Sequence, residues 1–268
     1  MKTFQDLQEG VYDPNILKAF FLAGGPGSGK SYVVARGAGG LGLRVVNSDD
    51  TFEKLLKDAG MSLDIRELDP EVRDTMRGVA KGITKRQQAN YIMGRIGLVI
   101  DGTGKDYDKI TTQATKLKQL GYDVHMIFVN TSLDTAIKRN AERPRKLPNS
   151  VVTQSWNDVQ KNIGKFSQYF RQNFMVVDNN DTKEDVMTPV YKQVMSMAKK
   201  KVQNKTGLAW IANELEMKKD SGGAGVLGKG RGGGKRQTIE PKKRAEIKKG
   251  GFSKFARRTR WFADSQKF

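Results

Sequence analysis

The chain has 268 residues, with 48 Lys and Arg against 29 Asp and Glu, one His and no Cys. This length is enough for one α/β domain of about 200 residues, plus a tail or a small second unit. The absence of Cys excludes disulfides and thiolate metal sites, so we expect oxygen ligands around any bound metal. No apolar run reaches the roughly 18 residues of a membrane-spanning helix, and the first residues lack the apolar core of a secretion signal. We expect a soluble, cytoplasmic protein without a membrane partner.

The net charge of +19 is concentrated near the end of the sequence. Residues 221–268 carry 14 Lys and Arg against 3 Asp and Glu, whereas residues 1–220 carry 34 against 26. The end segment includes the run SGGAGVLGKGRGGGKRQ, whose few apolar residues cannot offset the entropy lost on ordering. We predict a domain over residues 1–220 and a basic, flexible, glycine-rich tail over 221–268. Basic and aromatic residues together suit a nucleic acid, and a solubilising or partner-docking tail is the alternative.

Apolar segments alternate with helix-like segments from residue 18 onward, which is typical of a parallel sheet with helices on both faces. Five segments have the dense apolar composition of strands buried on both faces. They span residues 19–23, 43–46, 98–101, 123–130 and 174–177. The pattern predicts an α/β fold with a five-stranded parallel sheet.

Helices are predicted between these strands. One ends just before Gly121. A single long helix is predicted over residues 152–170, because apolar residues recur there at alternating steps of four and three. Thr188 and Pro189 resemble an N-cap and first-turn proline, and they predict the last helix of the domain, through about Lys201. His125 lies inside the fourth strand and is predicted to be a packing residue. The acidic residues 178–185 are predicted to form a turn.

The segment GGPGSGKS follows the first strand directly and precedes the helix-compatible run SYVVAR. It satisfies the P-loop pattern G-x-x-x-x-G-K-[ST] in the required strand-to-helix context. The loop consists of Gly24, Gly25, Pro26, Gly27, Ser28, Gly29, Lys30 and Ser31. Its backbone N–H groups can converge on phosphates, while Lys30 reaches the β and γ phosphates and Ser31 ligates Mg²⁺. The motif predicts a P-loop NTPase fold that binds ATP and Mg²⁺, and a glycine-rich turn without a ligand is the alternative.

Two carboxylates, Asp49 and Asp50, follow the second strand in NSDDTFE. They are expected at the carboxyl edge of the sheet, where open α/β sheets bind their ligands. A carboxylate there can accept the proton of an attacking hydroxyl. The alternative is a capping box, because Glu53 stands three residues after Asp50.

A third carboxylate, Asp101, ends the third strand in LVIDGTG. Asp101 can hold Mg²⁺ through water or orient an acceptor, and an ordinary Asp-Gly turn is the alternative. Further along, AIKRNAERPRKLP places Arg139 and Arg143 one helical turn apart, with Arg145 after a proline. Such arginines can close over a triphosphate and neutralise the γ oxygens, and a solvated basic face is the alternative.

Five stretches of this sequence resemble those of P-loop kinases that include the zeta toxins and the phage-type polynucleotide 5′-hydroxyl kinases. They are GGPGSGKS, the DDTF around Asp50, the IDGTG around Asp101, KLKQLGYDVHMIFV and RNAERPR. The resemblance implies that Asp50 is the general base, with the adjacent Asp49 as the alternative. It also implies that Asp101 and Thr103 lie near the acceptor, and that Arg139 acts in a lid with Arg143 or Arg145.

One position departs from the polynucleotide kinases, which keep an arginine shortly after the base. Phe52 and Glu53 stand there in this chain. The resemblance implies a kinase that moves the γ-phosphate of ATP to a hydroxyl, on either a nucleic-acid end or a nucleotide-sugar-like small molecule. Residues 51–96 form the longest insertion and are expected to build the acceptor site. The alternative function is a nucleic-acid-binding protein with a structural or regulatory ATP site.

Overall fold

The computed structural model describes residues 11–13, 15–37, 41–65, 67–143, 146–180 and 187–220. All of them belong to the first of two compact units, which spans residues 1–222. The second unit, residues 223–268, lies outside the described residues, and so does the predicted basic tail.

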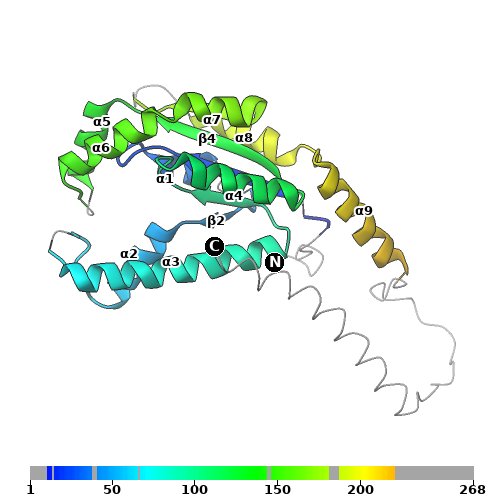
Figure 1. The fold of residues 1–268 in the computed structure, drawn as a ribbon, viewed down its shortest axis with the longest axis horizontal. Coiled ribbons are helices and arrows are strands. Elements are labelled where there is room, and N and C mark those ends of the chain that lie inside the picture. Colours follow the sequence, from blue (N-terminus) through cyan, green and yellow to red (C-terminus); the bar gives the residue numbers. More distant parts are fainter. Residues whose placement is uncertain are drawn as a thin grey trace, which may run out of the picture. The chain divides into compact units, whose positions relative to one another are not determined.

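A sheet of five parallel strands forms the centre of this unit (Figure 1). The strands are β1 Lys18–Ala23, β2 Arg44–Val46, β3 Leu98–Asp101, β4 Asp123–Asn130 and β5 Phe174–Asp178, in the spatial order β2-β3-β1-β4-β5. β1, which leads into the P-loop, is the central strand, between β3 and β4. The predicted α/β fold with a five-stranded parallel sheet is confirmed.

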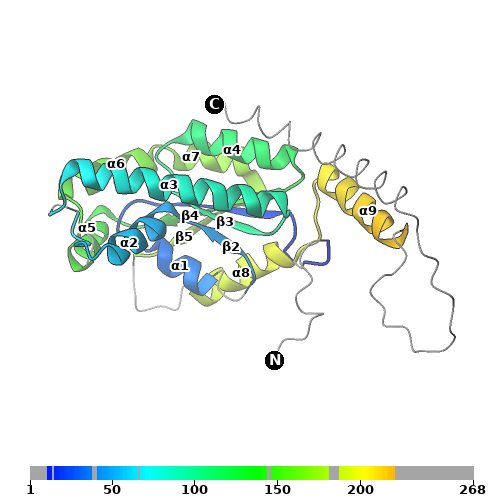
Figure 2. The ribbon, with the colours of Figure 1, turned by 90° about the horizontal axis from the view of Figure 1, so that it is seen from below.

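Helices cover both faces of the sheet. They are α1 Lys30–Gly37, α2 Ser48–Asp58, α3 Pro70–Met93, α4 Tyr107–Gln119, α5 Leu133–Glu142, α6 Asn149–Gln160, α7 Ile163–Phe170, α8 Met187–Lys199 and α9 Lys205–Asp220. Alternate residues of β1 point to opposite faces, as the pleat requires. Phe20 and Leu22 pack with residues of α1 and α8, whereas Phe21 and Ala23 pack with residues of α4, α6 and α7. Figure 2 shows α1 and α8 on one side of the strands and α4 and α7 on the other.

Two helix predictions were wrong. The segment predicted as one long helix forms two, α6 and α7, because the helix is interrupted at Lys161 and Asn162. There the Asn162 side chain donates hydrogen bonds to the carbonyls of Gly104 (3.1 Å) and Lys105 (2.9 Å), which ties the break to the loop after β3. In addition, α8 is not the last helix of the domain, since α9 follows it.

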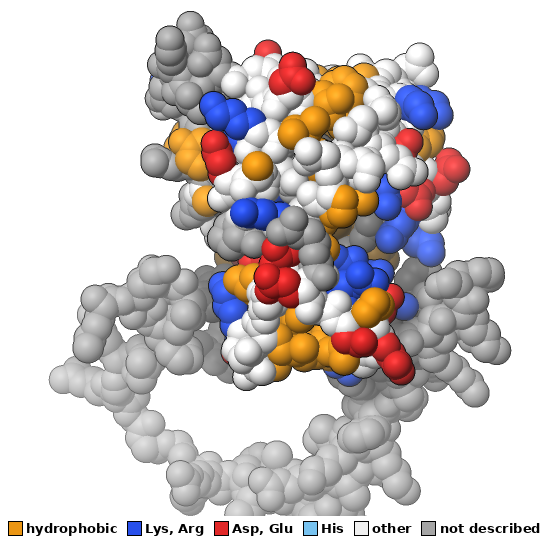
Figure 3. Space-filling view, turned by 90° about the vertical axis from the view of Figure 1, so that its left-hand side faces the viewer, with side chains coloured by type: hydrophobic (Ala, Val, Ile, Leu, Met, Phe, Trp, Pro, Cys, Tyr) orange, Lys and Arg blue, Asp and Glu red, His pale blue; other side chains and the backbone are white. Residues whose placement is uncertain are grey.

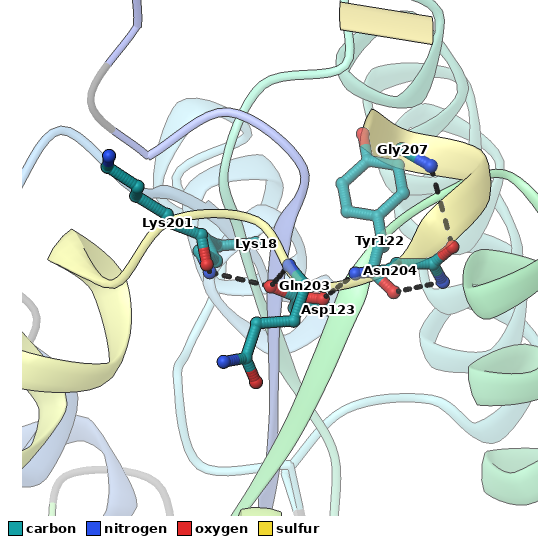
Figure 4. Close-up of polar contacts among 7 residues, drawn as sticks. All are labelled: Lys18, Tyr122, Asp123, Lys201, Gln203, Asn204 and Gly207. Carbon is teal, nitrogen blue, oxygen red and sulfur yellow. Dashed lines mark hydrogen bonds and ion pairs between the residues drawn. The ribbon is translucent and has the colours of Figure 1, made fainter. Parts of the chain in front are cut away.

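A buried ion pair lies at the amino edge of the sheet (Figure 4). Lys18 Nζ and Asp123 Oδ2 are 2.7 Å apart, and the two side chains are only 2% and 11% exposed. The Asp123 carboxylate also accepts hydrogen bonds from the backbone N–H groups of Gln203 and Asn204, both at 2.9 Å. Asn204 in turn accepts from the N–H groups of Thr206 and Gly207 at the start of α9. This network joins the segment before α9 to β1 and β4.

His125 occupies the packed position predicted for it. It is 6% exposed, and its ring stacks on Phe20 with 4.9 Å between ring centroids. Among the residues that the structure describes, none of the helices combines the length and apolarity needed to cross a bilayer.

Helices α2 and α3 lie side by side, to one side of the sheet in Figure 1. They pack through their own small apolar cluster, made of Phe52, Leu56, Ile65 and Ala80. The predicted insertion, residues 51–96, is therefore chiefly this pair of helices, which stands beside the carboxyl end of β2 and leads back into β3.

Candidate active site

The P-loop joins the end of β1 to the start of α1, and glycine is required at several of its positions. Gly27 and Gly29 have φ angles of 78° and 87°, in the left-handed region that side chains disfavour. A Cβ atom at Gly27 would collide with the backbone of Ala136, and one at Gly29 would collide with the side-chain amide of Asn179. The loop is thus held in a tight turn by its neighbours from α5 and the end of β5.

Hydrogen bonds fix the loop against the other strand ends. Gly24 N donates to the carbonyl of Thr103 (2.9 Å), and the Asn179 amide donates to the carbonyl of Ser28 (2.8 Å). Lys30 Nζ donates to the carbonyl of Gly24 (2.7 Å), so the ammonium group lies within the curve of the loop. The hydroxyl of Ser28 is buried and has no hydrogen-bond partner among the described residues.

Asn47 positions the first turn of α2, which carries Asp49 and Asp50. Its side-chain oxygen accepts from the N–H of Asp49 (2.8 Å), and its amide donates to Asp101 Oδ2 (3.1 Å). Asn47 is therefore the N-cap of a helix that begins at Ser48. The capping box proposed for Asp50 and Glu53 is wrong, because Asp50 already lies inside the helix. Both aspartates are exposed.

Asp101 lies at the end of β3, where charged residues from four segments meet. The residue is half-buried, but its Oδ1 atom is shut off from solvent and accepts no hydrogen bond from the described residues. Burial raises the pKa of Asp101 above its ordinary value; the charge of Lys30 opposes this shift, while Asp50 and, less strongly, Asp49 add to it. Arg143 also lowers the pKa of Asp101. These residues therefore form one electrostatically connected cluster.

The two described arginines of the predicted lid act on different parts of the site. Arg139, in α5, donates from Nη1 to the carbonyl of Asn179 (2.8 Å), beside the P-loop at Gly29. Arg143 follows the last residue of α5 and acts on Asp101. Arg145 lies outside the described residues. The spacing of one helical turn therefore places Arg139 beside the loop and Arg143 within reach of the carboxylate cluster.

Four asparagines that hold the site were not predicted as site residues. Asn179 and Asn180 follow β5; Asn180 Oδ1 accepts from the hydroxyl of Thr131 (3.2 Å) and from the N–H of Ser132. Asn162 and Asn47 hold the segments after β3 and before α2, as described above. Residues 178–180 were predicted only as part of a turn, and nothing in the local sequence indicates that Asn179 binds the P-loop.

The residues fit a magnesium-bound nucleotide. The loop has the glycines that a close phosphate approach requires, and Lys30 lies inside its curve. The buried Asp101 Oδ1 and the exposed Ser31 hydroxyl are oxygen ligands of the kind that Mg²⁺ prefers. Within the described chain, no three acidic or imidazole side chains gather to hold a metal by themselves.

Several solved structures have partial similarity to this chain. The crystal structure of AvrRxo1-ORF1:-ORF2 with ATP is similar with a TM-score of 0.50 at 15% identity, over 67% of this chain and 64% of that one. A Chloroflexus aurantiacus protein proposed to be a kinase has a TM-score of 0.49 at 15% identity, over 71% and 99%. Shikimate kinase from Acinetobacter baumannii, in complex with shikimate, has a TM-score of 0.39 at 17% identity, over 70% and 97%. At these identities the comparison concerns the fold alone.

The comparison with protein families is more specific. No match is found among curated proteins. The profile of the family described as Zeta toxin matches residues 8–190, which is more than half of the chain. The matched segment contains the five strands, the P-loop, the three aspartates and the lid arginines. The chain therefore belongs to the zeta toxin family.

Proposed function

We propose that this protein is a kinase that transfers the γ-phosphate of ATP to a hydroxyl group. Membership in the zeta toxin family and the P-loop kinase fold support a kinase-type phosphotransferase. The observation that carries the finer proposal is the buried Oδ1 of Asp101, which has no hydrogen-bond partner among the described residues and lies within electrostatic reach of Lys30 and Asp50. A buried carboxylate oxygen without a partner costs stability, so its retention beside the P-loop favours a ligand that satisfies it.

The P-loop is the proposed site of the triphosphate. The backbone N–H groups of Gly27, Gly29, Lys30 and Ser31 are proposed to surround the phosphates, and the N-terminus of α1 adds positive potential. Lys30 is proposed to contact the β and γ phosphates, because its ammonium group lies inside the loop. Magnesium, held by Ser31, by Asp101 and by phosphate oxygens, would supply additional positive charge at the transferring group.

Asp50 is the proposed general base. The acceptor oxygen attacks the γ-phosphorus, the bond from this phosphorus to the bridging oxygen of ADP breaks, and the hydroxyl proton passes to Asp50. Asp50 is exposed in the first turn of α2, and its charge acts on Asp101 more strongly than that of Asp49 does. Asp101 and Thr103 are proposed to orient the acceptor, because Asp101 ends β3 and Thr103, two residues later, accepts a hydrogen bond from the P-loop at Gly24.

The arginines have distinct proposed roles. Arg143, which acts electrostatically on Asp101, is proposed to neutralise charge on the γ oxygens as the phosphoryl group moves. Arg139 contacts Asn179, which itself binds the P-loop, so Arg139 acts mainly on nucleotide binding. The acceptor, a nucleic-acid end or a nucleotide-sugar-like molecule, is proposed to bind between the P-loop edge and α2 and α3.

Turnover by two neighbouring variants tests this proposal. Asp50→Asn should lower ADP release with the acceptor by ~10²- to 10⁴-fold, the usual contribution of a positioned general base. Asp49→Asn is the matched control and should have a much smaller effect. ATP affinity, measured by calorimetry, should change little in either variant. A large loss in Asp49→Asn alone would move the base by one residue, and normal turnover by both variants would refute a carboxylate base in α2.

A further inference from the structure

Helix α3 carries a row of basic residues that are not part of the proposed ATP site. Residues 75–100 contain no Asp or Glu, and their basic residues are Arg77, Lys81, Lys85, Arg86 and Arg95. Together with Arg73, three of these residues recur at steps of four: Arg77, Lys81 and Lys85. Residues four apart are neighbours on a helix surface, and each step advances about 6 Å along the axis. The four side chains therefore form a row about 18 Å long.

Most of this row lacks an acidic partner. Arg73 forms a 2.9 Å ion pair with Asp74, but Arg77, Lys81 and Lys85 form none with the residues that the structure describes. Arg77 lies over the ring of Phe52, 5.3 Å from its centroid, and its buried Nε atom has no hydrogen-bond partner in the described chain. Lys81 and Lys85 are exposed. Asp74 also acts electrostatically on Arg77 and Lys81, so the described domain neutralises the positive charge of the row only in part.

The row leads to the proposed base. The hydroxyls of Thr84 and Thr51 share a hydrogen bond of 3.1 Å, and Thr84 is buried between the two helices. Thr51 is adjacent to Asp50, and Thr84 is adjacent to Lys85. The row therefore starts at the level of the first turn of α2 and continues toward the N-terminus of α3. Figure 3 looks onto the carboxyl end of the sheet and shows Lys and Arg side chains on both flanks of the lower part, where α2 and α3 lie, with Asp and Glu side chains among them.

We propose that the row Arg73, Arg77, Lys81 and Lys85 binds the phosphates of a single-stranded nucleic acid whose terminal hydroxyl is the acceptor at Asp50. This inference rests on the proposed kinase function and selects between its two acceptor classes. The two adjacent phosphates of a nucleotide sugar would occupy only one end of the row. A strand with one phosphate in each nucleotide can instead meet successive cations, and such contacts dominate affinity for nucleic acids.

The length dependence of phosphorylation by the full chain tests this inference. The acceptors are a dinucleotide and a single strand of about 12 nucleotides, both with a free 5′-hydroxyl. The intact protein should prefer the longer strand, with a lower KM. In Lys81→Glu/Lys85→Glu this preference should fall about tenfold or more, and the salt slope of log kcat/KM should weaken by about 1.4, since each lost phosphate contact accounts for about 0.7. Lys81→Gln/Lys85→Gln should show a smaller loss in the same direction.

The matched control is Lys116→Glu/Lys192→Glu, which changes the net charge equally at exposed positions of α4 and α8. It should retain the preference for the longer strand. Equal loss in the control, or an unchanged preference in both α3 variants, would overturn the inference. If no oligonucleotide is phosphorylated while another acceptor supports Asp50-dependent turnover, the inference fails and the kinase proposal stands. If no acceptor supports Asp50-dependent turnover, the kinase proposal fails first, and the inference fails with it.

Discussion

The amino and carboxyl edges of the sheet both remove charged side chains from water, and they satisfy those charges differently. At the amino edge, Lys18 and Asp123 form an ion pair of 2.7 Å, and the Asp123 carboxylate also accepts hydrogen bonds from two backbone N–H groups. At the carboxyl edge, Asp101 receives one side-chain hydrogen bond, from Asn47, while its other oxygen and the Ser28 hydroxyl are buried without partners among the described residues. The two buried charges at the amino edge satisfy each other, whereas the carboxyl edge leaves two buried polar atoms without partners among the described residues.

His125 must be compared with Asp101, because it also has buried polar atoms. Both of its ring nitrogens are buried without partners in the described domain, yet it is a neutral ring stacked on Phe20 inside the core. A missing partner alone therefore does not identify a site. At Asp101 the missing partner coincides with a P-loop lysine and two further carboxylates, and this combination favours a ligand site.

The largest expected effect on stability comes from breaking the amino edge. Asp123→Ala leaves Lys18 buried without its carboxylate and removes the acceptor for two backbone N–H groups, so unfolding should become easier by about 3–5 kcal/mol. Urea unfolding followed by circular dichroism measures this change. Mg-ATP affinity of the folded variant should remain near that of the intact protein, because the pair is at the edge opposite the P-loop.

A double variant tests the same ion pair without leaving one charge unpaired. Lys18→Met/Asp123→Leu removes both charges, and replacing a buried pair by apolar residues is often neutral. It should recover much of the stability lost in Asp123→Ala, although the N–H groups of Gln203 and Asn204 remain without their acceptor. An Asp123→Ala protein as stable as the original would show that the pair does not hold the amino edge together.

A smaller effect is expected from His125 and depends on pH. Burial and, next, the charge of Lys18 lower the pKa of His125 from 6.5 to about 4. The unfolded chain therefore binds more protons than the folded one between these values, so stability is fully present above pH 6.5 and falls as the pH drops toward 4. From about pH 7 to about pH 4 this residue should account for a loss of roughly 3 kcal/mol.

His125→Phe removes this titration and keeps an aromatic ring on Phe20. Over the same pH interval, the free energy of unfolding of this variant should fall by roughly 3 kcal/mol less than that of the original protein. The difference between pH values is the informative quantity, because the larger ring can change packing equally at every pH. Identical acid sensitivity of both proteins would mean that His125 is not buried as a neutral ring.

The parts of the fold that depend on local pattern were predictable. Each buried strand is a dense apolar run, and the P-loop combines glycines, Lys30 and Ser31 within eight residues, so nearby positions specify both. The carboxyl ends of parallel strands meet at one edge of the sheet, so the sequence alone predicts that Asp50 and Asp101 lie near each other.

The parts that depend on distant contacts were not predictable. Asn179 binds the P-loop from 151 positions away, and an amide after a strand does not show by itself which carbonyl it meets. Asn162 interrupts the helix between α6 and α7, but the apolar spacing continues in phase across the break and hides it. Helix α9 has a weak amphipathic pattern and begins from a network around Asp123 that is formed only in the folded chain.

The most direct test of a phosphate-binding P-loop is a calorimetric titration of the full chain with Mg-ATP. We predict saturable binding by the intact protein and a loss of about tenfold or more in affinity for Lys30→Ala, because the ammonium group is the cation within the loop. Lys192→Ala, at an exposed position of α8, should bind like the intact protein. Equal affinity of Lys30→Ala and Lys192→Ala for Mg-ATP, with both proteins folded, would contradict a phosphate-binding carboxyl edge.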